Sequence, residues 1–193
     1  LRFAASEKVR VFGANLSYGA GSLTGGATSN LTIGTGSDIT LNAISNGLNN
    51  FFTGRSITLG ADLTVNGTLT LTAGTFTIGT STLTLNGPTI AGIPANLVTA
   101  TTSSLVFGGS SSGVFIPGSI TNLNNLTLNN PNGVTLNSNI TLAAGGVLTL
   151  TSGIIQAGTN TLKITNTNPA AAVIWTAGSF VNLTSGAVER TLA

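Results

Sequence analysis

The chain has 193 residues, enough for one domain with a hydrophobic core, and only 5% of them are charged. Soluble domains carry about 25% charged residues, so this chain must stay soluble through neutral Thr, Ser and Asn. It contains no Cys, His or Met, which excludes disulfides, thiol catalysis, imidazole chemistry and the usual zinc sites. Its net charge is only +2, and its Lys and Arg residues are too scattered along the sequence for nucleic-acid binding.

The first segment, residues 1–20, differs from the rest of the chain. It holds four of the charged residues and the only Tyr, and it lacks the apolar stretch of a signal peptide. We therefore expect that a leader has been removed or that the chain is a piece of a longer protein. The segment would form an atypical start or cap, and its candidate end-to-end contacts are Arg2, Glu7, Lys8 and Arg10.

From residue 21 onward the recurring unit is a triplet of apolar residue, Thr and apolar residue. Leu63-Thr64-Val65 and Leu148-Thr149-Leu150 are two of its many copies. Side chains alternate along a strand, so each triplet points two apolar groups inward and one hydroxyl outward. Thr is β-branched and favours strand geometry. The triplets therefore predict strands of three or four residues.

Short corners of Gly, Asn, Ser and Asp separate these triplets, and strands so short do not suit an ordinary sandwich. They suit an all-β, parallel β-solenoid with three strands per coil and roughly 20 residues per coil. We expect one domain over residues 1–193, with about eight to nine coils that occupy residues 21–170. Pro94 and Pro117 mark corners of a looser middle stretch.

An internal duplication supports the repeat architecture. Ser56–Gly87 resembles Gly133–Asn166, and Ser56 aligns with Gly133, 77 positions later. The offset becomes 79 after a two-residue insertion near Ala144 and Gly145. At roughly 20 residues per coil, this shift corresponds to about four coils.

Other structural classes fit less well. Disorder requires low hydrophobicity or high net charge, whereas 41% of this chain is hydrophobic. A membrane helix needs about 20 continuous apolar residues, but Thr, Asn and Gly interrupt every run. A membrane β-barrel also alternates, yet one Trp, one Tyr and 8 Phe cannot form two aromatic girdles. We therefore expect no membrane insertion.

The last segment, residues 171–193, is expected to be a C-terminal end or interface. It contains the only Trp and nearly closes with a charged pair. Stacked coils expose strand edges at both poles, and such edges need caps or partners. The candidate contacts at this end are Trp175, Glu189 and Arg190.

Four segments carry a family resemblance: Gly21–Gly34, Leu105–Leu142, Gly146–Ile164 and Gly178–Leu192. They resemble the β-helical repeat regions of large secreted, adhesin-like surface proteins of Bacteroidetes-type bacteria, which often leave the cell by the type IX secretion route. The resemblance implies a right-handed parallel β-helix at the cell surface. It implies no catalytic residue, cofactor or metal site, and residues 1–20 fall outside the pattern.

Two acids and one lysine are the candidates for catalysis. Asp38 and Asp62 are 24 positions apart, about one coil, so they could stack as the two carboxylates of a glycoside hydrolase. Both also occupy turn-forming sequences, and a role as corner residues is the simpler interpretation. Lys163 could form a dyad with a serine, but no motif supports it.

The densest threonine arrays are Thr68, Thr70 and Thr72, and Thr80, Thr82 and Thr84. Their alternation predicts an outward face, and the two groups could share it. Such arrays order water in several ice-binding proteins. Thr also occurs on all sides of the predicted coil, so it is more simply explained as an uncharged solubilising residue. We further expect Asn residues to stack coil upon coil in corners: Asn124, Asn125, Asn129 and Asn130.

The sequence thus favours a non-enzymatic, extracellular structural or adhesive protein. It would act as a surface stalk, an adhesin repeat or a filament subunit that associates end to end with itself or with flanking repeats. The alternative is a module that binds glycans or another surface through a Thr and Asn face, with ice binding less favoured. A polysaccharide-active enzyme is the least favoured class, because only four acids are present.

Overall fold

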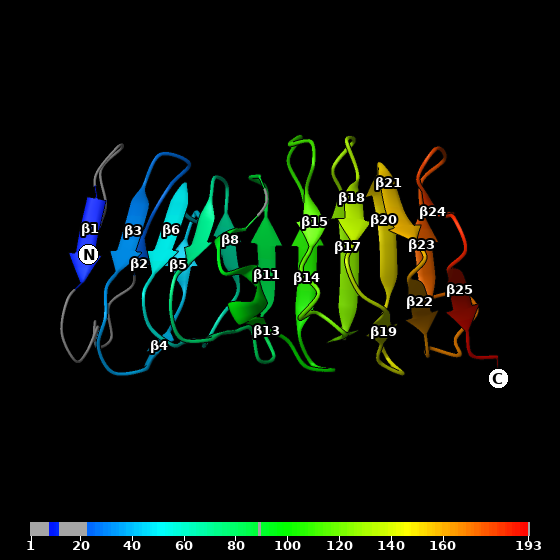
Figure 1. Cartoon of the computed structure of the whole chain (residues 1–193), viewed down its shortest axis with the longest axis horizontal. Coiled ribbons are helices and arrows are strands. Elements are labelled where there is room, and N and C mark those ends of the chain that lie inside the picture. Colours follow the sequence, from blue (N-terminus) through cyan, green and yellow to red (C-terminus); the bar gives the residue numbers. More distant parts are fainter. Residues whose placement is uncertain (1–7, 12–22, 89, 193) are drawn as a thin grey trace.

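The computed structural model describes residues 8–11, 23–88 and 90–192. All paired strands run parallel and stack into a β-solenoid of about eight turns, about 21 residues apart. Figure 1 shows the resulting rod, with β1 at one end and β25 at the other. The predicted all-β parallel solenoid and its coil length are therefore confirmed.

The strands form where the triplets are. In β7 (Ile57–Leu59), for example, both apolar residues are buried and the Thr between them is exposed. Most triplets show this alternation, because a strand places consecutive side chains on opposite faces of the sheet. The inward residues fill the rod and the outward Thr residues contact water.

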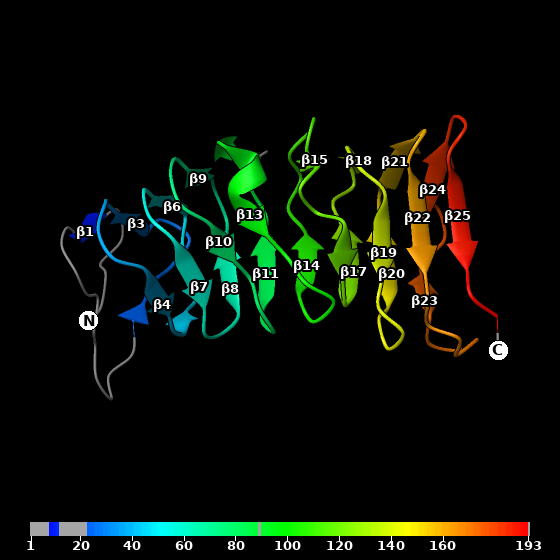
Figure 2. The ribbon, with the colours of Figure 1, turned by 60° about the horizontal axis from the view of Figure 1, so that its bottom comes forward.

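Each coil crosses three sides of the rod in the same order. The first side is one continuous six-stranded sheet through most of the molecule (Figure 2). Its strands are β8 (Leu63–Val65), β11 (Thr82–Leu85), β14 (Ser104–Phe107), β17 (Asn125–Asn129), β20 (Leu148–Ser152) and β23 (Val173–Trp175). A small sheet of β2 (Leu23–Thr24) and β5 (Ile44–Ser45) precedes it, and a bridge from Leu48 to Val65 connects the two regions.

The second and third sides each consist of two sheets. The second side comprises β1 (Lys8–Val11), β3 (Asn30–Ile33), β6 (Asn50–Thr53), β9 (Leu69–Leu71) and β12 (Ala91–Gly92), then β15 (Phe115–Ile116), β18 (Val134–Leu136), β21 (Ile154–Gly158) and β24 (Phe180–Leu183). The third side comprises β4 (Ile39–Leu41), β7, β10 (Phe76–Thr77) and β13 (Leu97–Val98), then β16 (Asn122–Leu123), β19 (Ile140–Leu142), β22 (Thr161–Ile164) and β25 (Ala187–Arg190).

The break in these two sides coincides with the looser middle stretch. Pro94 begins the 3-10 helix η1 (Pro94–Asn96), and proline cannot donate a ladder hydrogen bond. Pro117 directly follows β15, and its carbonyl accepts a hydrogen bond from the Ile120 N–H at 3.0 Å. Both prolines thus lie at corners, as predicted. The first side runs through this region without a break and joins the two halves of the rod.

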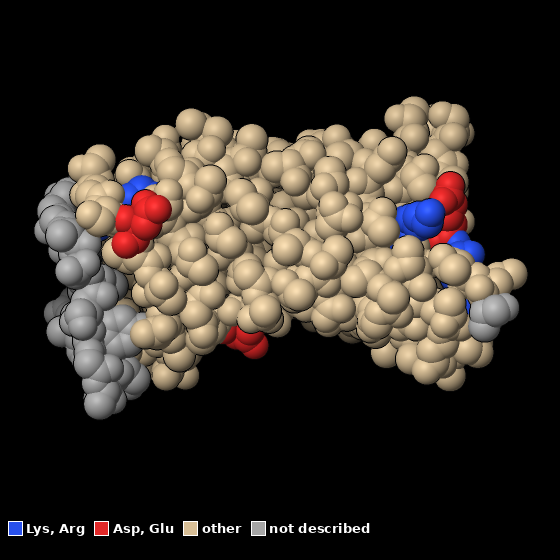
Figure 3. All heavy atoms as spheres, turned by 90° about the horizontal axis from the view of Figure 1, so that it is seen from below, with Lys and Arg blue, Asp and Glu red and all other residues tan. Residues whose placement is uncertain are grey.

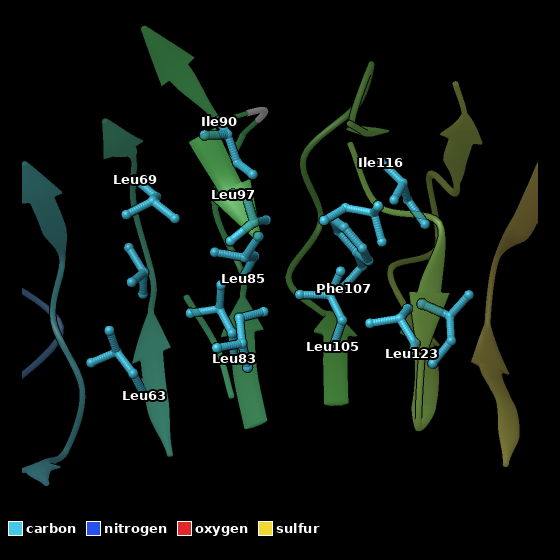
Figure 4. Close-up of a cluster of buried hydrophobic side chains, with 14 of the residues drawn as sticks. Leu63, Leu69, Leu83, Leu85, Ile90, Leu97, Leu105, Phe107, Ile116 and Leu123 are labelled. Atoms are coloured by element: carbon cyan, nitrogen blue, oxygen red, sulfur yellow. The ribbon is translucent and has the colours of Figure 1, made fainter. Parts of the chain in front are cut away.

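The core consists of columns of apolar residues that lie directly above one another. One column on the first side contains Val65, Leu85, Phe107, Leu128 and Leu150, all buried. Figure 4 shows Leu85 and Phe107 pointing into the rod, beside residues of the other sides such as Leu97 and Ile116. Every inward side chain is therefore packed mainly by the coils before and after its own.

The last coil is longer than the earlier coils of the described chain. Asn50 contacts Thr68 in the next coil, 18 residues later, whereas Gln156 contacts Asn182, 26 residues later. The extra residues of the last coil lie in its corners, because its strands still pair in parallel with β20, β21 and β22.

The shift of the internal duplication agrees with the expected size of about four coils, but it is not a whole number of coils. β7 belongs to the third side, whereas its counterpart β18 belongs to the second side. Likewise β8 lies on the first side and its counterpart β19 on the third. The two copies are therefore offset by one side of the rod, and the same sequence can serve on any side.

Candidate interface at the C-terminal pole

The three sides of the rod end together in the last coil. β23, β24 and β25 are the terminal strands of their sheets in the part of the chain that the structure describes. Each pairs with the strand before it and presents its other edge at the end of the rod. We call this end the C-terminal pole and define it by residues 171–192, which include the predicted contacts Trp175, Glu189 and Arg190.

Core columns end uncovered at this pole. Trp175 pairs with Leu150 and thus continues a column whose five earlier members are buried, yet Trp175 is 64% exposed. Val188 pairs with the buried Leu162 and is 44% exposed. These side chains occupy inward positions, and they are exposed because β23 and β25 are the last strands of their sheets in the described residues.

Two outward positions of the last coil, Ile174 and Phe180, are also apolar. Ile174 pairs with Thr149 in a column that otherwise consists mostly of Thr, and Phe180 on β24 is 49% exposed. Of the nine exposed large hydrophobic residues in the described chain, six lie at the pole: Ile174, Trp175, Phe180, Leu183, Val188 and Leu192. The exposed apolar residues of the described chain are thus concentrated at this end, which makes it the candidate interaction surface.

Charged residues occupy the third side of the pole. Lys163 on β22 faces outward, and its cross-strand neighbour on β25 is Glu189. Arg190 pairs with Ile164, and its Nη2 donates a hydrogen bond to the Thr167 carbonyl oxygen at 3.3 Å. On the face that Figure 3 shows, this charged cluster is separated from the acids of the N-terminal half by a long uncharged surface.

Two of the other predicted contacts lie at the opposite end of the rod. Lys8 and Arg10 lie in β1, which pairs with β3. Arg2 and Glu7 lie outside the described residues. The structure therefore places Lys8 and Arg10 at the end of the rod opposite to Trp175, Glu189 and Arg190.

The two candidate catalytic acids do not stack, which corrects that expectation. Asp38 precedes β4 on the third side, whereas Asp62 precedes β8 on the first side. Asp62 Oδ1 accepts a hydrogen bond from the Thr82 N–H at 2.7 Å. In the duplicated segment Asn139 Oδ1 accepts one from the Thr161 N–H at 2.8 Å. Asp62 is thus a corner residue that an Asn can replace.

The six threonines of the predicted face lie on two different sides of the rod. Thr70 is in β9 on the second side, with Thr68 and Thr72 beside it. Thr82 and Thr84 are in β11 on the first side, and Thr80 precedes them. The six residues therefore do not form one face, because β9 and β11 belong to different sheets and β10 on the third side lies between them in the chain.

Asparagine stacks exist, but not where the sequence predicted them. Asn86 Nδ2 donates to Asn66 Oδ1 at 2.8 Å, and Asn50 Nδ2 donates to Asn30 Oδ1 at 2.7 Å. Each of the four predicted residues instead forms a hydrogen bond with a serine of the coil before or after it. Asn125 contacts Ser104, Ser152 donates to Asn129, Asn130 donates to the Ser111 carbonyl, and the Asn124 N–H donates to the Ser103 carbonyl.

Arg55 is a structural residue that the sequence did not reveal. Its side chain is almost fully buried, and its Nε donates to the Gly34 carbonyl at 2.6 Å. Its other nitrogens donate to the carbonyls of Thr35 and Ser37. The guanidinium group thus fixes the corner between β3 and β4 of the preceding coil. A single Arg in an uncharged stretch was the only signal available.

No protein-family model, curated protein or solved structure matches the chain. The described residues contain no cluster of three or more acidic, His or Cys side chains that could hold a metal ion. Among the same residues, no helix is long and apolar enough to cross a membrane.

Proposed function

We propose that this chain is a non-enzymatic, extracellular structural module that is extended at its C-terminal pole by another solenoid coil. It would serve as a surface stalk, an adhesin repeat or a filament subunit. The observation that carries the proposal is Trp175, a residue in a core column that stands exposed at the end of the rod. Its position implies that a further coil completes the column.

The geometry of the pole supports a partner of one particular shape. Three strand edges lie around one core, so a partner covers them best if it presents three short strands wound around its own core. Unpaired edges of this kind are templates for strand addition. A solenoid coil has this shape, and the internal coils of the chain already show how it packs.

The apolar composition of the pole supports the same conclusion. Burial of apolar surface contributes roughly 25 cal/mol per Å². A coil that covers Trp175, Val188 and Leu183 therefore makes the free energy of association more favourable. The coil can come from a flanking repeat or from a second copy of the chain. The proposed location at the cell surface rests on the family resemblance of the repeats.

Size measurements combined with electron microscopy test the proposal. We expect the wild-type chain to form rods joined end to end as its concentration rises, and Trp175→Lys to remain a single rod. The control is Val98→Lys, because Val98 is 37% exposed on the third side, away from the pole. Strictly single wild-type rods at high concentration would refute the filament version, and an equal effect of both variants would refute the pole as the contact.

A further inference from the structure

Arg190 occupies a core position of the last coil. Its partners in the two preceding coils are Ile164 and Leu142, which are both buried apolar residues. The other inward positions of this coil carry apolar residues such as Trp175, Val181 and Val188. One column of the solenoid therefore ends in a permanent positive charge, because a guanidinium group does not lose its proton in proteins.

The Arg190 side chain is directed to another segment of the last coil. Its Nη2 donates to the carbonyl of Thr167, a residue in the connection from β22 to β23. This contact links the third side to the corner that leads to the first side. The residue is exposed, so its charge is hydrated as long as no coil covers it.

A coil that continued all three ladders would bury this charge. Removal of a guanidinium group from water is costly unless a paired anion compensates it, and inward-pointing charges are a known means of preventing strand addition at sheet edges. The edges of β23 and β24 carry no such charge and are flanked by Trp175 and Phe180. The pole is thus open on two sides and protected on the third.

We propose that Arg190 limits end-to-end association, so that a second copy of this chain docks by its N-terminal coil on β23 and β24 but not on β25. This inference rests on the proposed function. The occupant follows from strand direction: every ladder is parallel, and the strands that end the three sides at the other pole are β2, β1 and β4 in the described residues. Only head-to-tail stacking of two copies continues parallel pairing on the same sides.

Head-to-tail contacts of this kind are not closed and produce open chains of rods. With one of three ladders blocked, the association remains weak and reversible. Replacement of Arg190 by an apolar residue completes the third column and should lengthen the chains.

The test compares Arg190→Leu with Lys163→Leu. Both variants exchange one positive charge for the same apolar side chain, but Lys163 is an outward residue one coil earlier. Sedimentation of each purified chain over a concentration series gives the association constant. We expect Arg190→Leu to associate about tenfold more tightly or better, given the cost of burying an unpaired charge, and Lys163→Leu to match the wild type. The double variant Trp175→Lys, Arg190→Leu should lose association. This result would distinguish stacking at the pole from non-specific aggregation.

The outcomes distinguish this inference from the proposed function. If Arg190→Leu and Lys163→Leu associate equally while Trp175→Lys abolishes association, the pole is the contact and the role of Arg190 is refuted. If the wild type stays single and Arg190→Leu forms chains, the role of Arg190 is supported and the filament version of the proposed function fails. Dimers that never extend would indicate contacts between the same pole of two copies. They would overturn the proposed docking of the N-terminal coil of a second copy.

Discussion

Equivalent inward positions are buried in the body of the rod but exposed at its C-terminal pole. Phe107 and Trp175 belong to one column on the first side, but Phe107 is 2% exposed and Trp175 is 64% exposed. The difference is the presence of a following coil. In a solenoid, burial depends on the stacking of neighbours and not on the position of a residue within its own coil. An aromatic side chain can therefore be a core residue or a contact residue.

The two regions also differ in how their surfaces stay soluble. Outward positions in the body carry mostly neutral Thr, as in the column Thr64, Thr84, Val106, Thr127 and Thr149, in which Val106 is the one apolar member. At the pole the same column ends in Ile174. The pole thus departs from the body at inward and outward positions alike, which agrees with the proposed role of the pole as a contact surface.

The largest difference in unfolding free energy should appear when one aromatic ring is removed from the body and, separately, one from the pole. Phe107→Ala leaves a cavity in a packed column and should cost about 3–5 kcal/mol of unfolding free energy. Phe180→Ala at the pole should cost less than about 1 kcal/mol, because Phe180 is half exposed. Urea unfolding followed by circular dichroism measures both values.

Dilute samples are required for this pair, because association at the pole would add to the apparent stability. Equal losses for the two variants at low concentration would show that the last coil is packed like the body. The comparison between the two regions would then be wrong.

The strands and the coil length were predictable from the sequence because they depend on local patterns. A triplet such as Ile57-Thr58-Leu59 has the same meaning in every coil, and the turn residues between triplets limit strand length. The position of a strand on a particular side was not predictable, because all three sides accept the same triplet. For this reason the sequence allows the threonines of β9 and β11 to share one face, although they lie on different sides.

The functional features depend on contacts between coils, which no local pattern encodes. Arg55 resembles any corner residue until the preceding coil supplies three carbonyl groups to it. Trp175 and Arg190 were predicted as contacts from their rarity alone. Their inward positions became evident only from the pairing with Leu150 and Ile164.

A smaller effect is expected from glycines that differ only in their distance to the preceding coil. Gly109 and Gly113 lie in one loop and have the same φ of 69°. A Cβ at Gly109 would lie 1.9 Å from the Asn86 carbonyl oxygen, whereas a Cβ at Gly113 meets nothing within 4 Å. Gly113→Ala should therefore cost only the left-handed strain of about 1–2 kcal/mol.

Gly109→Ala carries the same strain and in addition forces two coils apart, which should add about 1–3 kcal/mol. Thermal and urea unfolding of the two variants isolate this added cost, since the backbone conformation is matched. If both variants lose the same stability, coil contacts in the body tolerate an extra methyl group, and close stacking is not what distinguishes the body from the pole.

The smallest effect should come from the only acid in the middle of the body, and it also tests the enzymatic alternative. Asp62 and Asn139 hold equivalent corners of the duplicated segment and accept the same kind of backbone hydrogen bond. Asp62→Asn should therefore change the unfolding free energy by less than about 0.5 kcal/mol, whereas Asp62→Ala should cost about 1 kcal/mol because the Thr82 N–H loses its acceptor. If Asp62 were a catalytic carboxylate, the result would differ: Asp62→Asn would leave the unfolding free energy unchanged but abolish the turnover of a polysaccharide. Stability and turnover measured on the same two variants thus separate a corner residue, for which only the acceptor oxygen matters, from a catalytic acid, for which the charge matters.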